Sequence, residues 1–286
     1  MSTVPQILRS VYRFLKPFFE PAPFPKGRPK ADEGAGMYIR SFLFLRLMIG
    51  FLGVTLPFTL VFFDWLAFSG DPVPRGSMSI YYYSGMREVF TVTLGTIAFF
   101  LFAYKFTEKN LDNTLSIVAG LAGMTIPLFP TGRPRGVHPL PSLTPLQNLI
   151  GEDWTKYIHY GASAIFIASL GGICVLFGRR ERKRPEHGNI LPARFWQGWH
   201  FVCAGAIVVA SIWIVVTTWF VHGPYWSLLV GEGVSAVAFG ASWFVKGAEI
   251  RYLFGHDEPT APGQAEATTA LRSPLATGMP SESAIL

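Results

Sequence analysis

The chain has 286 residues, of which 50% are hydrophobic and only 15% carry a charge, and its mean hydropathy is +0.34. Soluble globular domains carry about 25% charged residues, so this composition excludes an ordinary soluble protein and indicates an integral membrane protein. The formal net charge is +6. It requires no nucleic-acid partner, because the basic residues follow a pattern that membrane topology explains.

Residues 1–40 precede the first predicted membrane span. Apolar residues recur at helical spacing between Ile7 and Phe18, with Arg9 and Arg13 beside them. This pattern predicts a short amphipathic helix that lies in the membrane interface without crossing it. The Pro- and Gly-rich stretch Pro21–Gly36 is expected to be a linker. We therefore predict a cytoplasmic N-terminal segment over residues 1–40.

Long apolar segments follow between residues 41 and 250, each close to the ~20 residues that a helix needs to cross the hydrocarbon core. They are apolar or small on nearly every side, unlike the amphipathic helices of soluble proteins. The six predicted spans are Ser41–Phe68, Glu88–Phe106, Asn113–Phe129, Tyr157–Gly178, His200–Phe220 and Tyr225–Val245. Residues 251–286 are predicted to be a disordered cytoplasmic tail. The fold prediction is an all-α polytopic membrane protein with six transmembrane helices.

Lys and Arg residues are distributed unequally between the two sides of the predicted spans. Eighteen lie before the first span, in the second and fourth loops or after the last span, whereas five lie in the other loops. Both termini are therefore predicted to be cytoplasmic. Tryptophans near the predicted span ends are expected to form an aromatic belt at the membrane interfaces. They are Trp65, Trp154, Trp219, Trp226 and Trp243.

The first external loop ends in a polar sequence that runs directly into the second predicted span. Hydrogen-bonding side chains there include Ser77, Ser79, Tyr82, Arg87 and Glu88. Ser84, Glu88, Thr91 and Gly95 share one helical face, which is expected to turn inward because lipid would penalise it. The alternative is that residues 81–83 are ordinary interfacial tyrosines, and that Arg87 pairs with a lipid phosphate or with Glu88.

Glu232 lies about eight residues inside the last apolar run, where an unpartnered carboxylate costs a few kcal/mol. His159 lies in the fourth predicted span, and glycines and alanines around Glu232 allow helices to approach closely. We therefore expect Glu88, His159 and Glu232 to converge in a polar pocket on the outer side. The other candidate ligand-binding residues are Arg87, Ser77, Ser79 and Tyr82.

Two carboxylates and an imidazole are compatible with three roles: a structural hydrogen-bond network, binding of a ligand or substrate, and acid/base or metal-assisted catalysis. Single residues on separate helices do not distinguish these roles. Cys174 and Cys203 are the only cysteines and are interpreted as small buried hydrophobes. No metal ligands are assigned, and the sequence indicates no particular cofactor.

Two sequence motifs support a family resemblance. Ser77-Met78-Ser79-Ile80-Tyr81-Tyr82 followed by Arg87-Glu88-Val89-Phe90, with the later Glu232 and Ala238–Trp243, resembles an uncharacterised family of bacterial multi-pass membrane proteins. The likeness spans roughly residues 41–250, and the family pattern often has Asp at the position of Glu88. The resemblance implies six spans in a bacterial cytoplasmic (inner) membrane. It carries no established activity.

The chain lacks a hallmark of the ceramidase-like transmembrane hydrolases. They use a serine, an acid and several histidines around zinc, and their late-helix H-x-x-x-H pair is missing from this chain. The leading functional prediction is therefore binding or sensing of a small or lipidic ligand in the outer pocket. Alternatives are an intramembrane metal-dependent lipid hydrolase, and a scaffold or assembly subunit with a membrane-protein partner. Whether the protein is an enzyme stays open at this point.

Overall fold

The computed structural model describes residues 30–71, 73–103, 110–134, 139–181 and 193–247, with backbone only for residues 30–40, 42, 43, 193 and 247. The regular elements within these ranges are all helical. The predicted amphipathic helix at Ile7–Phe18 and the predicted tail over residues 251–286 lie outside the described residues.

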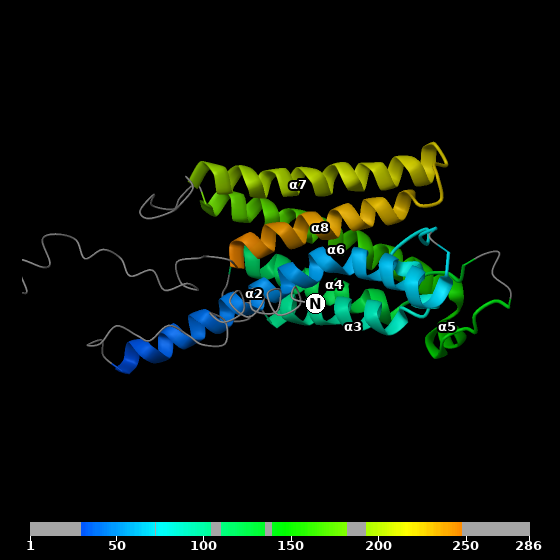
Figure 1. The fold of residues 1–286 in the computed structure, drawn as a ribbon, viewed down its shortest axis with the longest axis horizontal. Coiled ribbons are helices and arrows are strands. Elements are labelled where there is room, and N and C mark those ends of the chain that lie inside the picture. The colour runs from blue at the N-terminus through cyan, green and yellow to red at the C-terminus, as the bar shows by residue number, and fades with distance from the viewer. Residues whose placement is uncertain (1–29, 72, 104–109, 135–138, 182–192, 248–286) are drawn as a thin grey trace, which may run out of the picture. The chain divides into compact units, whose positions relative to one another are not determined.

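Long helices make up most of the described chain, and they run side by side (Figure 1). They are α2 (Lys30–Phe63), α3 (Arg87–Ala103), α4 (Leu111–Leu128), α6 (Glu152–Glu181), α7 (Ala193–Val215) and α8 (Ser227–Gly247). Wider π-helical turns extend α2 over Asp64–Ser69 and α7 over Val216–Phe220. Two short helices lie between the long ones, the 3₁₀-helix η2 (Ser79–Tyr83) and α5 (Pro145–Ile150).

Five stretches of the described helices are long and apolar enough to cross a membrane. They are Phe44–Ser69, Leu111–Leu128, Glu152–Glu181, Arg194–Phe220 and Ser227–Lys246. The prediction of an all-α, multi-pass membrane protein is confirmed at this level. The second predicted span corresponds to α3, whose 17 described residues are not among the five.

The start of the first long helix differs from the prediction. α2 begins at Lys30, so the expected linker over Pro21–Gly36 is wrong for its last seven residues. The far end of this helix agrees with the prediction, because its π-helical extension stops at Ser69. Gly70 caps it with φ +64°, a left-handed conformation that glycine adopts without steric cost.

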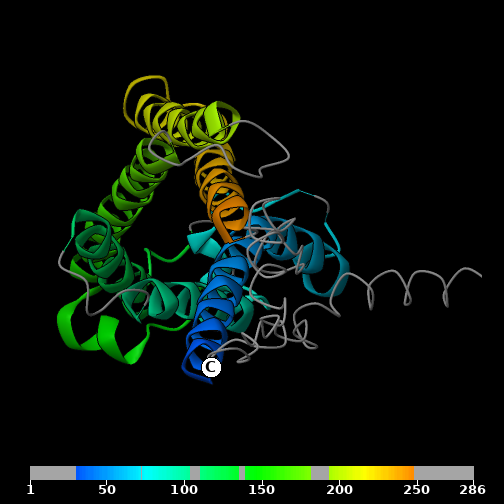
Figure 2. The same ribbon diagram turned by 90° about the vertical axis from the view of Figure 1, so that its left-hand side faces the viewer.

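The six long helices form a ring. Contacts run from α2 to α3, α4, α6, α7 and α8 and back to α2, as the view along the helices shows (Figure 2). Glycines allow the closest approach, between α2 and α8. A Cβ on Gly240 would lie 2.6 Å from Val54 N, and one on Gly50 would lie 2.5 Å from Phe244 N. The predicted role of small residues around Glu232 is confirmed at Gly240.

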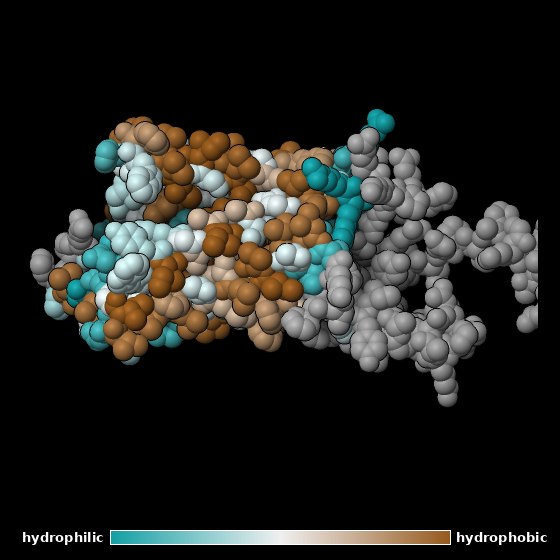
Figure 3. Space-filling view, turned by 180° about the vertical axis from the view of Figure 1, so that it is seen from behind, coloured by the Kyte–Doolittle hydropathy of each residue, from teal (hydrophilic) through white to brown (hydrophobic). Residues whose placement is uncertain are grey.

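Large apolar side chains cover the outside of the ring. Leu121, Val202 and Val209 are each more than half exposed, which suits contact with lipid and not with water. Brown surface dominates the helices in Figure 3, and teal patches lie toward the two ends of the bundle. Four of the five tryptophans predicted for an aromatic belt are exposed, at 40–75%. Trp243 is fully buried against Phe177 and Phe239, so its assignment to the belt is wrong.

The interior holds two apolar clusters, one toward each end of the ring. One contains Leu101, Phe177 and Trp243, together with both cysteines, which are buried and free as expected. The other contains Leu60 and Phe90 together with loop residues that include Tyr81. The segment between α2 and α3 is therefore packed into one end of the bundle. We call residues 77–83 the cap segment and this end of the ring the cap end.

Ion pairs join helices at the end of the ring opposite the cap end. Arg180 pairs with Asp112 at 2.5 Å, which joins α6 to α4. Lys246 pairs with the buried Glu181, which joins α8 to α6. On α7, His200 lies 2.8 Å from Ser242 Oγ of α8. These helix ends are thus held by charges and hydrogen bonds in addition to apolar packing.

Candidate functional site

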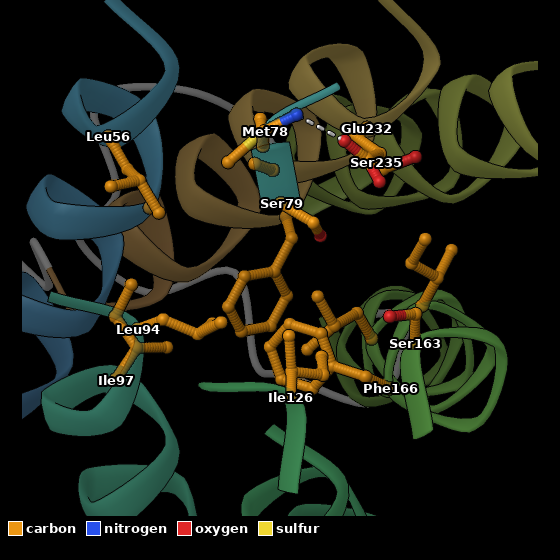
Figure 4. A pocket seen from close by; sticks show the side chains of 15 residues that line it. Leu56, Met78, Ser79, Leu94, Ile97, Ile126, Ser163, Phe166, Glu232 and Ser235 are labelled. Atoms are coloured by element: carbon orange, nitrogen blue, oxygen red, sulfur yellow. Dashed lines mark hydrogen bonds between the residues drawn. The ribbon is translucent and has the colours of Figure 1, made fainter. Parts of the chain in front are cut away.

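A cavity of about 80 Å³ lies inside the ring, below the cap segment (Figure 4). Four long helices besides α8 and the cap segment contribute to its walls, whereas α7 contributes none of the lining residues. The lining residues are Gly53, Leu56, Met78, Ser79, Leu94, Ile97, Ile126, Ser163, Phe166, Ile167, Leu170, Glu232, Ser235, Ala236 and Phe239. One carboxylate and three hydroxyl groups are thus set among apolar walls, so the pocket is far less polar than the sequence suggested.

Glu232 reaches the cavity because of its position on α8. The helix begins at Ser227, so Glu232 lies about 8 Å along it. Ser235 and Phe239 follow at the i+3 and i+7 positions and are both buried, so all three side chains share the inward face. Glu232 keeps partial exposure because the cavity lies against it.

The cap segment supplies the partner of this carboxylate. The backbone N–H of Met78 donates to Glu232 Oε2 at 2.6 Å, as the dashed line in Figure 4 shows. Among the described residues this is the only hydrogen bond to the Glu232 side chain. A second link nearby, from Leu229 N to Gly76 O at 3.0 Å, fixes the start of α8 against the same loop.

Basic side chains at the cap end are engaged elsewhere. Arg75 donates to Asp64 at 2.8 Å, and Arg133 donates to Glu152 at 2.9 Å. Arg87, for which Glu88 was one expected partner, donates to Tyr82 Oη at 2.7 Å and lies over the Tyr82 ring. Within the described residues no cationic side chain pairs with Glu232.

His159 lies behind the cavity wall. Its Nδ1 lies 2.8 Å from Phe129 O and 3.2 Å from Ile126 O, and its Nε2 lies 2.9 Å from Ser79 Oγ. Carbonyl oxygens only accept, so Nδ1 carries the proton, and in the neutral ring Nε2 accepts from the Ser79 hydroxyl. The buried imidazole therefore holds Ser79 in the cavity wall and does not line the cavity itself.

The structure places Glu232 in the cavity, His159 behind the cavity wall and Glu88 outside, so the three side chains do not meet in one pocket. His159 and Glu232 hold consecutive residues, Ser79 and Met78, of the cap segment. Glu88 is exposed and does not line the cavity. The reason is helix phase: α3 begins at Arg87 and buries Phe90, so Glu88, two residues earlier, points about 200° away from the core.

Gly95 confirms that this polar face of α3 turns outward. A Cβ on Gly95 would have no atom within 4 Å, so the expectation that the face of Glu88 and Thr91 turns inward is also wrong. The Glu88 backbone carbonyl accepts from Thr91 Oγ1 at 3.2 Å, which is a local contact within the helix. The apolar face of α3 is the one that lines the cavity, through Leu94 and Ile97.

The tyrosines of the cap segment are packed into the bundle and do not lie in the lipid interface. Tyr81 is fully buried, and Tyr82 is 8% exposed. Tyr83 Oη donates to Thr131 O at 2.6 Å and accepts from Gln147 Nε2 at 2.8 Å. Burial raises the pKa of Tyr81 and of Tyr83 above the usual phenol value. The hydroxyl of Ser77, also buried, accepts from Ile80 N–H at 3.2 Å.

Sequence reasoning missed the residues that support the cap segment from outside. Gln147 is buried, and it forms a capping box with Thr144, with Pro145 at the first turn of α5. The sequence Thr-Pro-Leu-Gln has the spacing of such a box, so α5 was readable in the sequence. The Met78 backbone N–H had no comparable sequence signature, because it is a main-chain group placed by tertiary folding.

Metal binding receives no support from this geometry. Among the described residues no three His, Cys, Asp or Glu side chains lie close enough to hold an ion. His159 is occupied on both ring nitrogens and Glu88 lies outside the cavity. Comparisons of the chain with protein-family models, curated proteins and solved structures find no match.

Proposed function

We propose that this chain is a six-span protein of a bacterial cytoplasmic membrane that binds a small or lipidic ligand in the cavity below the cap segment. The observation that carries the proposal is Glu232, a carboxylate about 8 Å along a membrane helix that faces an apolar cavity and takes one hydrogen bond. An intramembrane carboxylate is costly, so such a position marks a site of function by default.

The proposed sixth span is α3. Its 17 residues extend about 26 Å, close to the hydrocarbon thickness, and it occupies the ring position between α2 and α4. Val92 and Phe99 are exposed on its outer face, at 66% and 56%, as lipid contact requires. An even number of spans agrees with the Lys and Arg distribution, which favours cytoplasmic termini and places the cap segment on the outer side.

The cavity suits a small ligand or one chain of a larger amphiphile. Its ~80 Å³ offers space for roughly six water-sized groups, since one such group needs about 10–15 Å³. Specific small-molecule sites combine apolar walls with a few polar groups that fix orientation. In this cavity the polar groups that could fix a ligand's orientation are the side chains of Glu232, Ser79 and Ser235.

The test is the ligand that the protein retains. Glu232→Gln keeps the side-chain shape and removes the charge, whereas Glu88→Gln makes the same change at an exposed carboxylate and serves as the matched control. Mass spectrometry of extracts from the purified protein should find a bound small molecule in the wild type and Glu88→Gln, and less of it in Glu232→Gln. Equal content in all three proteins, or none in any, would overturn the proposal.

The two alternative functions predict different observations. An intramembrane metal-dependent lipid hydrolase requires a stoichiometric metal and release of a fatty acid or head group from added lipid. A scaffold or assembly subunit requires a partner complex that survives Glu232→Gln. No specific contact of the described residues favours either function.

A further inference from the structure

We infer that the ligand is a single-chain primary or secondary amine, whose ammonium group lies at Glu232 and whose apolar body extends down the cavity. The inference rests on the proposed ligand-binding function and names the chemistry that the site selects. The charge of the Glu232 side chain points to a cationic ligand. Glu232 Oε2 accepts one backbone hydrogen bond, and Oε1 accepts none from the described residues. A carboxylate in an apolar cavity is stabilised by an opposite charge, and the bound ligand would supply it.

The hydroxyl groups near Glu232 offer acceptors. Ser235 Oγ donates its proton to Gly231 O at 2.9 Å, and Ser79 Oγ donates to His159 Nε2 at 2.9 Å. Each oxygen then has only lone pairs left for a ligand. Figure 4 shows Ser79 and Ser235 on the same side of the cavity as Glu232. An ammonium group, which has N–H donors and no acceptor, matches this arrangement.

The apolar part of the cavity lining limits what the rest of the ligand can be. Below Glu232 the cavity is lined by apolar side chains that include Leu94, Ile97, Phe166, Leu170 and Phe239. A small cavity of this kind accepts an aliphatic or aryl body and not the two chains of a phospholipid. None of the described residues that line the cavity is Lys or Arg, so the phosphate of a lipid such as phosphatidylethanolamine would lack a partner among them.

Four eight-carbon probes separate these properties: octylamine, octyltrimethylammonium, octanol and octanoate. The first two share a positive charge and differ in N–H donors, whereas octanol tests the apolar body alone. Binding is measured on the full chain by native mass spectrometry and by the shift in thermal unfolding. We expect octylamine to bind about tenfold tighter than octanol or octyltrimethylammonium, and octanoate to bind most weakly.

Protein variants then test whether Glu232 causes the preference for octylamine. Glu232→Gln should remove the preference for octylamine while octanol binding persists, and Glu88→Gln should leave the preference unchanged. Ala236→Phe and Ser163→Leu fill the cavity from different helices, and each should reduce binding of both probes. Using both variants guards against a folding defect in one of them.

The outcomes distinguish the two proposals. Equal binding of octylamine and octanol, with a bound molecule still lost in the cavity-filling variants, would overturn the amine and leave the binding function in place. Binding of neither probe, with cavity-filling variants that retain wild-type ligand content, would overturn both. Loss of octylamine binding in phosphatidylethanolamine nanodiscs but not in phosphatidylglycerol nanodiscs would contradict a single-chain ligand and assign the site to the lipid head group.

Discussion

The Met78 backbone N–H donates to Glu232 Oε2 at 2.6 Å and joins two residues that are 154 positions apart in the chain. The next residue, Ser79, is held by His159 at 2.9 Å. The cap segment is therefore attached to α8 through one residue and to α6 through its neighbour. Each attachment gives a prediction that does not depend on the identity of the ligand.

Met78→Pro should release the cap segment from Glu232. Met78 has φ −61°, which proline adopts without strain, and proline lacks the N–H that donates to the carboxylate. Loss of a hydrogen bond to a charged group costs about 1.5–3 kcal/mol, so thermal unfolding of the variant should begin at a lower temperature. Met78→Leu keeps the N–H and serves as the control. Equal stability of the two variants would show that this bond contributes little.

Ser79 and His159 should be energetically coupled. Ser79→Ala leaves Nε2 of the buried imidazole without its partner, at a cost of about 1–3 kcal/mol. His159→Phe removes the ring nitrogens, and the double variant should be destabilised by less than the two single changes together. Unfolding by SDS titration measures all three. Strict additivity would contradict a direct bond between the side chains.

Close packing of α2 and α8 should depend on Gly240. In Gly240→Ala the added methyl group would meet the α2 backbone at 2.6–2.9 Å, and we expect a loss of about 1–3 kcal/mol in the free energy of unfolding. Gly233→Ala on the same helix is the control, since its nearest neighbour would be Pro57 Cβ at 3.5 Å. Both variants have the same change in helix propensity. Similar stability of the two would argue against the close contact.

Tyr81 and Tyr83 should ionise late in an alkaline titration. Burial raises the pKa of each in the folded protein above the ordinary value of 10.0. Stability from this difference is fully present below pH 10, and it is lost as the pH rises through the folded pKa values. Ultraviolet difference absorbance should therefore show a late tyrosinate phase, which shrinks in Tyr81→Phe and in Tyr83→Phe. A titration identical to that of the unfolded chain would contradict this.

Continuous apolarity made the positions of the helices predictable. Each predicted span overlaps one long helix, and the predicted end at Phe220 matches the end of the π-helical extension of α7. The order of helices around the ring was not predictable, because it depends on contacts between faces that look equally apolar in the sequence. Trp243 shows the same limit: its place near a helix end suggested the interface, but α8 turns it into the core.

In the candidate site, Glu232 was predictable because its depth within an apolar run is visible in the sequence. Glu232 was identified because a carboxylate within an apolar run needs a compensating contact, and that argument requires no knowledge of the neighbours. The assignment of Glu88 depended on the phase of α3, and a helix that begins at Arg87 directs this side chain outward. A main-chain donor such as Met78 N–H has no side-chain identity for sequence reasoning to detect.

The long separation between Met78 and Glu232 also has a consequence for biosynthesis. At about 5–20 residues per second, a ribosome needs roughly 8–30 s to make the 154 residues from Ser79 to Glu232. Throughout that interval the loop after α2 has been made while its acceptor on α8 has not, so this bond can form only after the first turns of α8 have been synthesised. Attachment of the cap segment to α8 is therefore a late step in the maturation of the protein.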